Sequence, residues 1–264
     1  MKQYLVPSQL RAAIRAGAFT GRIPGQCPGF VQANLAILPA DYADSFAQFA
    51  AKNAKACPIL ERLPAGSRRI SRLADAADVA TDLPRYRVFE HGEFQYECTD
   101  ISGLWRDDLV SFLIGCSFSF EDALAAGGIP MKYGADGKSG PVYYTNLPCE
   151  PAGPFSGTVA VSMRPVKRGK VADAVAITER FPHVHGGPVH IGDPAAIGIS
   201  DIGAPVFGSR IPIEPDEVPV FWACGVTPQL AILSAKPPIA ITHAAGHMFV
   251  SDLKNSGLEQ TLFA

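Results

Sequence analysis

Two stretches of the chain join an apolar run to a helix-like segment in the same order. In residues 110–124 (VSFLIGCSFSFEDAL), a run about as long as a buried strand is followed by a turn at residues 115–117. A helix is expected from about Ser119, with Ser119 as its N-cap. Residues 218–233 (VPVFWACGVTPQLAIL) repeat the design, with Thr227 as the expected N-cap in front of a proline. Each stretch therefore predicts a strand, a tight turn and a helix.

The two stretches align when one is shifted by 108 positions. Equivalent positions then hold related residues: Cys116 and Cys224, Ser119 and Thr227, Glu121 and Gln229. Each cysteine lies where a strand is expected to end and a helix to begin, and a helix N-terminus favours an anion, either a thiolate or a bound carboxylate. The alternative at each position is an inert, buried cysteine. The neighbouring candidates for capping or substrate binding are Ser117, Ser119, Gly225, Thr227 and Gln229.

Other patterns are shorter. Tyr42, Phe46 and Phe49 recur at helical spacing, which indicates a helix that packs one aromatic face. The segment TVAVSM alternates between apolar and polar positions, as a half-buried strand does. Helices are expected at residues 7–17, 39–53 and near 170–180, and extended segments at residues 82–89, 93–97, 158–163, 218–224 and 239–243.

Together these elements predict an α/β fold. Residues 127–130 mark a change in composition, after which strands and turns dominate until about residue 215. We expect a layered α/β/α main domain built from residues 1–128 and 216–264, with a smaller, strand-rich α+β domain inserted at residues 129–215. Open α/β sheets carry their sites at the carboxyl ends of strands, where both cysteine turns fall.

Composition and charge narrow the class of partner. The chain has 264 residues, of which 47% are hydrophobic and 18% charged, as in a folded protein. A net charge of −2 gives no electrostatic reason to expect nucleic acid or an anionic membrane as a partner. The sequence shows no signal-peptide pattern, no apolar run long enough to span a membrane and no CxxC pair among its six cysteines. We expect a cytoplasmic protein with a small-molecule ligand, and a homo-oligomer is compatible with these features.

A stretch rich in Gly and Pro, residues 20–34, is expected to be irregular. It ends in Gln32 and Asn34, two polar amides in front of the apolar residues 35–38. Loops of this kind often carry binding groups, so both amides are candidate substrate ligands. The alternative is that they bond only to their own backbone.

Histidines gather in one glycine-rich run, residues 182–194 (PHVHGGPVHIGDP). It contains four residues of metal-ligand type, namely His183, His185, His190 and Asp193. Their spacing matches no zinc motif, and neutral imidazoles could equally orient a carboxylate or move a proton. The sequence thus requires no cofactor, although a divalent metal is possible at these residues. His243 and His247 follow the last apolar strand, where a metal-ligand pair is the less favoured interpretation.

Arg164 follows the alternating strand and is a candidate carboxylate anchor, because a guanidinium binds a carboxylate in a two-pronged geometry. The alternative is a surface arginine beside Lys167 and Arg168. The chain has no G-x-S-x-G, P-loop or G-x-G-x-x-G motif. Their absence argues against an α/β serine hydrolase, a nucleoside triphosphatase and a dinucleotide-dependent enzyme.

Several long strings resemble the D-glutamate cyclase family, whose bacterial members are known as hydro-lyases. They are GQCPGFVQANLAILP, CPILE, FLIGCSFSFEDAL, FSGTVAVSMRP, HGGPVHIGDPAAIGI, VPVFWACGVTPQ and ITHAAGHMFVSDL, and they extend from about residue 25 to residue 253. The resemblance implies a cytoplasmic bacterial protein with a two-domain α/β fold. It also implies a reaction in which D-glutamate loses water to form 5-oxo-D-proline.

Such a cyclisation needs a general base, a general acid and donors for a tetrahedral oxyanion. Arg164 could hold the α-carboxylate, and the turns at residues 117–119 and 225–227 could supply backbone donors. A thioester route through either cysteine and direct attack by the amine both remain open. The candidate catalytic residues are Cys116, Glu121, Cys224, His185, His190 and His243.

Two other functions are compatible with the sequence. The duplicated cysteines would suit a cofactor-independent amino-acid racemase or epimerase that uses two thiols. Such an enzyme exchanges the substrate α-hydrogen with solvent and needs both cysteines. The third possibility is a protein that binds a small carboxylate without turnover, and its binding would survive removal of both cysteines.

Overall fold

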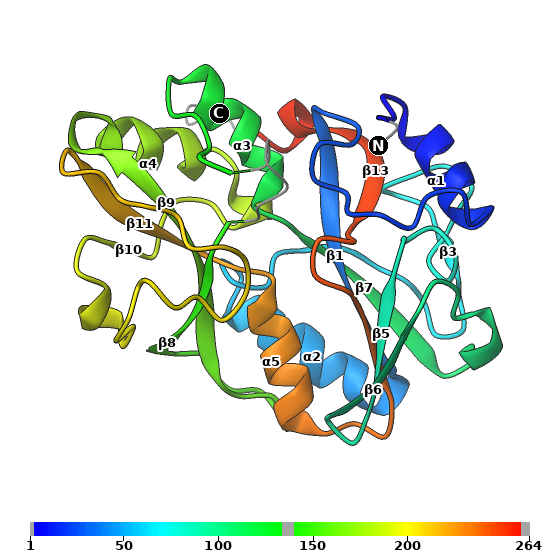
Figure 1. Cartoon of the computed structure of the whole chain (residues 1–264). Coiled ribbons are helices and arrows are strands. Elements are labelled where there is room, and N and C mark those ends of the chain that lie inside the picture. Colours follow the sequence, from blue (N-terminus) through cyan, green and yellow to red (C-terminus); the bar gives the residue numbers. More distant parts are fainter. Residues whose placement is uncertain (1–2, 134–139, 260–264) are drawn as a thin grey trace.

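Two adjoining sheets with helices around them make up the computed structural model, which describes residues 3–133 and 140–259 (Figure 1). The strands of the larger sheet are β1 (Phe30–Pro39), β2 (Ile59–Arg62), β5 (Tyr86–Glu90), β6 (Glu93–Cys98), β7 (Leu109–Gly115), β12 (Ala240–His243) and β13 (Phe249–Lys254). Their order is β2-β7-β1-β12-β5-β6, and β13 also pairs with β1. All of these pairings are antiparallel.

The central strand of this sheet is β1. It pairs with β7 along one edge and with β13 and then β12 along the other. Nine of its ten residues are buried. A strand that is covered on both faces lacks the alternation that marks a half-buried strand. The prediction of an irregular segment over residues 20–34 is therefore wrong from Phe30 onward, and Gln32 and Asn34 lie on a strand.

Two helices cover one face of the larger sheet. Helix α2 (Ala40–Lys52) follows β1 directly, and its Phe46 packs edge-on against Phe112 of β7. Helix α5 (Val226–Ala235) adds Ile232 to the same core. Fully burying side chains of this size stabilises the fold by roughly 1.5–3 kcal/mol each. The helix predicted at residues 39–53 is confirmed.

The N-terminal helix α1 (Pro7–Arg15) packs beside β13. Its Leu10 and Ile14 share a buried cluster with Val250, and Arg11 donates a hydrogen bond to the Val250 carbonyl oxygen. The predicted first helix is thus confirmed, although it ends two residues before residue 17.

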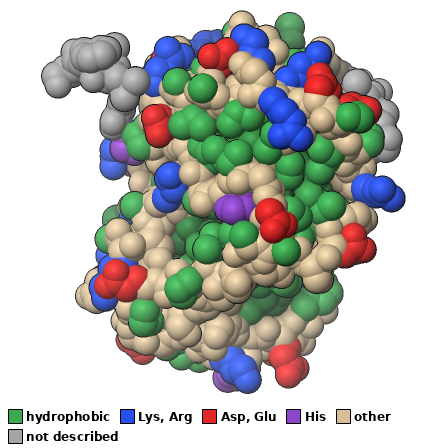
Figure 2. Space-filling model, turned by 90° about the vertical axis from the view of Figure 1, so that its left-hand side faces the viewer, with side chains coloured by type: hydrophobic (Ala, Val, Ile, Leu, Met, Phe, Trp, Pro, Cys, Tyr) green, Lys and Arg blue, Asp and Glu red, His purple; other side chains and the backbone are tan. Residues whose placement is uncertain are grey.

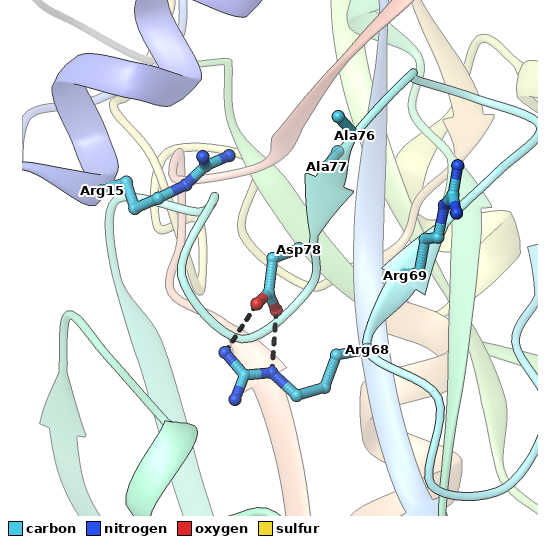
Figure 3. Close-up of a pocket in the computed structure, with 6 residues that line it drawn as sticks. All are labelled: Arg15, Arg68, Arg69, Ala76, Ala77 and Asp78. Carbon is cyan, nitrogen blue, oxygen red and sulfur yellow. Dashed lines mark hydrogen bonds and ion pairs between the residues drawn. The ribbon is translucent and has the colours of Figure 1, made fainter.

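The opposite face of the larger sheet is covered mainly by irregular chain, including β3 (Arg69–Ile70) and β4 (Ala77–Asp78). Carboxylates hold this chain in place. The Glu61 side chain accepts hydrogen bonds from the backbone N–H groups of residues 71–73. Arg68 makes a two-pronged ion pair with the carboxylate at the end of β4 (Figure 3). Because side chains satisfy the backbone here, no helical layer is needed on this face.

The smaller sheet has four strands, β8 (Val142–Pro148), β9 (Thr158–Lys167), β10 (His190–Ile191) and β11 (Glu217–Ala223), in the order β10-β11-β9-β8. Its pairings are also antiparallel. One face packs against α3 (Phe118–Ala126) and α4 (Val171–Glu179), through Phe120, Ala174 and Trp222 among others. The strand predicted at residues 158–163 and the helix near residues 170–180 are confirmed.

Each sheet sends a helix to the other. Strand β7 of the larger sheet leads into α3, which packs on the smaller sheet beside α4. Strand β11 of the smaller sheet leads into α5, which packs on the larger sheet beside α2 (Figure 1). The two strand–helix turns therefore meet where the sheets adjoin.

The α/β class is confirmed, with helices and strands mixed along the chain. The strand β11, which the sequence assigned to the main domain, pairs with β9 of the smaller sheet. The predicted boundary at residues 215 and 216 therefore separates two strands of one sheet, and the division into two domains stays a prediction.

The surface on the side of the smaller sheet mixes apolar and charged side chains (Figure 2). Hydrophobic side chains gather in its upper half, with basic and acidic side chains scattered around them. Exposed aromatic and aliphatic side chains include Tyr144 of β8, Ile191 of β10 and Phe207, which bridges to β8. In the residues that the structure describes, no helix has the length and apolar character to cross a membrane.

Candidate active site

The two strand–helix turns have the same geometry. In the larger sheet Ala33 of β1 lies opposite Gly115 of β7, and in the smaller sheet Val161 of β9 lies opposite Ala223 of β11. Shifting β7 by 108 positions and β1 by 128 positions maps the first pair onto the second. The repeat found in the sequence is therefore a repeat in structure, consisting of two paired strands and the helix that follows them.

A hydroxyl in the first turn of each helix binds the neighbouring strand. Ser119 Oγ accepts a hydrogen bond of 3.1 Å from the Gln32 N–H, and Thr227 Oγ1 accepts one of 2.9 Å from the Ala160 N–H. These bonds are also equivalent under the repeat. Both predicted N-caps are wrong, because the hydroxyls face the strands, and the actual N-caps lie two positions earlier in both helices.

One cavity of about 520 Å³ lies between the two turns, within the range of roughly 300–1,000 Å³ that is usual for small-molecule sites. Residues at the N-termini of α3 and α5 line this cavity, so the positive ends of both helix dipoles face it. The predicted site residues that line it are Asn34, Cys116, Ser117, Arg164, Cys224, Gly225, Gln229 and His243.

Both cysteines carry protonated thiols at neutral pH. Burial raises the pKa of Cys116 to about 12, and burial also raises the pKa of Cys224. Backbone N–H groups at the helix starts act in the opposite direction but do not outweigh the burial. The predicted alternative of a resting thiolate is therefore not supported, and a bound carboxylate at these helix ends stays a prediction.

The Arg164 guanidinium is buried, with 3% of its side chain exposed, and aromatic rings of α3 and β11 flank it. It donates to the Glu121 carboxylate and to the hydroxyls of Ser117 and Ser162, at 3.1 and 3.0 Å respectively. Tyr133 donates a further hydrogen bond of 2.5 Å to Glu121. Arg164 is thus no surface residue. Glu121 matches the charge of the Arg164 guanidinium. The hydrogen bonds that the guanidinium donates fix the hydroxyls of Ser117 and Ser162 at the cavity wall.

Glycine at position 225 leaves room for an amide. A Cβ there would overlap the side-chain amide of Asn34, whose Nδ2 donates a hydrogen bond of 2.9 Å to the Gly115 carbonyl oxygen. The amide therefore lies between the two strand–helix turns.

His243 presents a neutral ring to the cavity. Its Nδ1 accepts a hydrogen bond of 3.1 Å from the Leu35 N–H, and Gln229 Nε2 lies 3.5 Å from the same nitrogen. Burial lowers the pKa of His243 to about 4, so the ring is neutral at pH 7. Since Nδ1 is an acceptor, the proton of the neutral ring resides on Nε2. His243 can therefore donate a hydrogen bond from Nε2.

Several predicted site residues do not line the cavity. Gln32, Ser119 and Thr227 are buried between the helices and the strands. Glu121 lies behind Arg164 and reaches the cavity only through its hydrogen-bonded partners.

The predicted histidine cluster is not assembled. His185 Nδ1 bonds to the Lys55 carbonyl oxygen at 2.9 Å, and His190 Nε2 bonds to the Asp193 carbonyl oxygen at 2.7 Å. The chain turns at His185, where φ is 86°, and the next histidine is carried away on β10 at the edge of the smaller sheet. Across residues 3–133 and 140–259, no three His, Cys, Asp or Glu side chains, His183 included, are arranged to hold a metal ion.

The sequence did not single out five polar residues that line the cavity, namely Arg22, Arg87, Tyr133, Ser162 and Ser209. Ser162 had a signal, because it precedes Arg164 by two positions on a strand and so shares its face. Arg22 lies in the glycine-rich stretch that was expected to bind, whereas Tyr133 follows no pattern. Of the described residues that line the cavity, three are arginines and none is acidic.

Comparisons with known proteins show the family of the chain. The profile of the D-glutamate cyclase family matches residues 110–252, which include both strand–helix turns. A "Putative hydro-lyase" from Rhodopseudomonas palustris is 56% identical over 95% of this chain and 92% of its own length. Proteins of the same name from Clostridium beijerinckii and Stutzerimonas stutzeri are 50% and 49% identical, over 94% and 96% of this chain and 95% and 96% of their own lengths. The chain belongs to the D-glutamate cyclase family.

Proposed function

We propose that this protein is a hydro-lyase that cyclises D-glutamate to 5-oxo-D-proline, or that dehydrates a related small amino acid or carboxylate. The observation that carries the proposal is the cavity between the two turns, which holds three arginines, two helix N-termini and no acid among its described lining residues. Such a cavity favours a small anion. The family and the names of the relatives support the reaction class.

The reaction forms one bond from nitrogen to carbon and breaks one bond from carbon to oxygen. The ammonium group loses two protons, and they leave with one γ-carboxylate oxygen as water, so the net charge does not change. The enzyme must therefore move protons from nitrogen to oxygen and stabilise a tetrahedral oxyanion.

The residues of the cavity suit these tasks. Asn34 and the backbone N–H groups at the starts of α3 and α5 are fixed donors for the oxyanion. The Nε2–H of the neutral His243 ring can donate a hydrogen bond to the departing oxygen. The thiols of Cys116 and Cys224 are protonated donors, which supports direct attack by the amine over a thioester route.

A racemase that uses two thiols is the second candidate. The observation in its favour is that Cys116 and Cys224 occupy equivalent positions and line the same cavity. One thiol would have to ionise after the substrate binds, against the burial that raises both pKa values.

Proton NMR of the protein with D-glutamate in D₂O separates the candidates. We expect 5-oxoproline to form, and L-glutamate serves as the control substrate. Exchange of the α-hydrogen without cyclised product would favour the racemase, and the absence of both product and exchange would refute D-glutamate as the substrate. Cys116→Ser and Cys224→Ser are each expected to lower the rate while leaving some turnover, whereas a racemase would lose all activity in both variants.

The same assay tests for a metal. We expect EDTA to leave the rate unchanged, because the residues that were candidate ligands are held apart. Loss of activity with EDTA and its recovery with a divalent metal would contradict this expectation.

A further inference from the structure

The three arginines of the cavity differ in their partners. The Glu121 carboxylate matches the charge of Arg164. Arg87 pairs with Glu97, with 3.7 Å between Nε and Oε1. Arg22 makes no hydrogen bond or ion pair to any residue that the structure describes, although it lines the same cavity as both cysteines. Arg22 is therefore the guanidinium of the cavity that has no carboxylate within ion-pair distance among the described residues. Arg87 shares Glu97 with Arg85, and its Nε makes no hydrogen bond.

The Arg22 guanidinium packs against the backbone of a neighbouring segment. A Cβ on Gly246 would lie 2.5 Å from Arg22 Nε and 2.9 Å from Nη2, so the guanidinium packs directly against this glycine. The Ile23 N–H donates a hydrogen bond of 2.7 Å to the Gly246 carbonyl oxygen, which ties the two segments together. Arg22 itself is exposed to solvent. It is thus a cation on the cavity wall that is accessible from outside.

We propose that Arg22 determines substrate specificity by binding the carboxylate that the reaction leaves unchanged, so that the substrates are compact dicarboxylates. This inference rests on the proposed function. Cyclisation of D-glutamate consumes the γ-carboxylate, whereas the α-carboxylate persists in the product. A guanidinium fork suits a carboxylate, and the other two guanidinium groups of the cavity already have carboxylate partners.

The role has a kinetic signature. Because the α-carboxylate is the same in the substrate, the transition state and the product, its contact with Arg22 contributes equally to the binding of all three. Loss of the contact therefore raises KM and changes kcat little. For Arg22→Gln we expect KM for D-glutamate to rise about tenfold, the lower end for a charged hydrogen bond, because the side chain is exposed.

Calorimetry with two unreactive probes tests the inference independently of turnover. Glutarate has the two carboxylates of glutamate without its amine, and butyrate lacks one carboxylate. We expect the unmodified protein to bind glutarate about tenfold or more tightly than butyrate, and Arg22→Gln to abolish this preference. Gly246→Ala should weaken it by displacing the guanidinium. The control is Arg69→Gln, which removes an exposed arginine outside the cavity and should change nothing.

The inference is overturned if the unmodified protein does not prefer glutarate, or if Arg22→Gln keeps the preference. Its failure is distinguishable from failure of the proposed function. Cyclisation of D-glutamate with an unchanged KM in Arg22→Gln would leave the hydro-lyase standing and remove Arg22 from it. A glutarate preference that depends on Arg22, without any cyclisation, would leave the dicarboxylate site standing and remove the reaction.

Discussion

Replacing Glu121 by Gln tests whether the buried ion pair with Arg164 holds the candidate site together. The side chains of Arg164 and Glu121 are 3% and 14% exposed. Gln keeps an oxygen that can accept one hydrogen bond from the guanidinium, so the variant removes mainly the negative charge. The arginine then stays buried beside aromatic rings without a counter-charge.

The structure sets the size of the expected effect. Removing one partner of a buried ion pair costs about 3–5 kcal/mol, and the partial exposure of Glu121 places this pair near 3 kcal/mol. For a chain of this length, 3 kcal/mol corresponds to a fall in Tm of roughly 6–12 °C. The rate should fall too, since Ser117 and Ser162 depend on the same guanidinium.

Urea unfolding of a matched pair of variants provides the measurement. The control is Asp44→Asn, which breaks an ion pair with Arg62 of similar length whose side chains are 82% and 42% exposed. That change should cost no more than about 0.5 kcal/mol. The double variant Glu121→Gln with Arg164→Met should recover part of the loss, because it leaves no unpaired charge. If Glu121→Gln costs no more than Asp44→Asn, the reasoning is refuted.

Two further predictions concern stability. Ser119→Ala and Thr227→Val each leave a buried backbone N–H without its acceptor. Each variant should therefore lower the free energy of unfolding by about 1–3 kcal/mol, measured in urea. Clearly unequal decreases would contradict the equivalence of the two hydroxyls. Burial lowers the pKa values of His185 and His243 to about 4, below the value of 6.5 in the unfolded chain. Between pH 4 and 6.5 the unfolded state therefore binds more protons than the folded state, and the free energy of unfolding should fall as the pH falls from 6.5 to 4. His243→Asn, whose oxygen can replace the Nδ1 acceptor, should make that fall less steep, and an unchanged slope of urea midpoint against pH would count against it.

The local units of the fold could be predicted from the sequence. The change from an apolar run to a helical spacing of apolar residues can be recognised in the sequence itself. Both strand–helix turns and the helices α1, α2 and α4 therefore lie at about the predicted residues. The central strand β1 was missed, because burial on both faces removes the alternation on which the prediction depends. The N-caps were misplaced because Ser119 and Thr227 bind strands that lie far away in the sequence.

The site could be predicted only in part for a related reason. Cysteines at the starts of helices can be read from the sequence, and both line the cavity. Whether an arginine is free or neutralised depends on partners brought in by the fold. Arg164 has its carboxylate partner 43 positions away, and Arg22 has none in the described residues, so the sequence favoured the arginine whose charge is already matched.

The two halves of the site share a scaffold but differ in chemistry, and this difference bears on the reaction. Glu121 in one half bonds to a buried arginine, whereas its equivalent Gln229 lies beside the neutral ring of His243. A racemase needs an acid and a base of similar strength on the two faces of the substrate, which a symmetric pair of halves would supply. A cyclase must activate one carboxylate and leave the other untouched, which requires the two ends of the substrate to meet different surroundings. A charged network on one side and a neutral hydrogen-bond donor on the other therefore favour the hydro-lyase over the racemase.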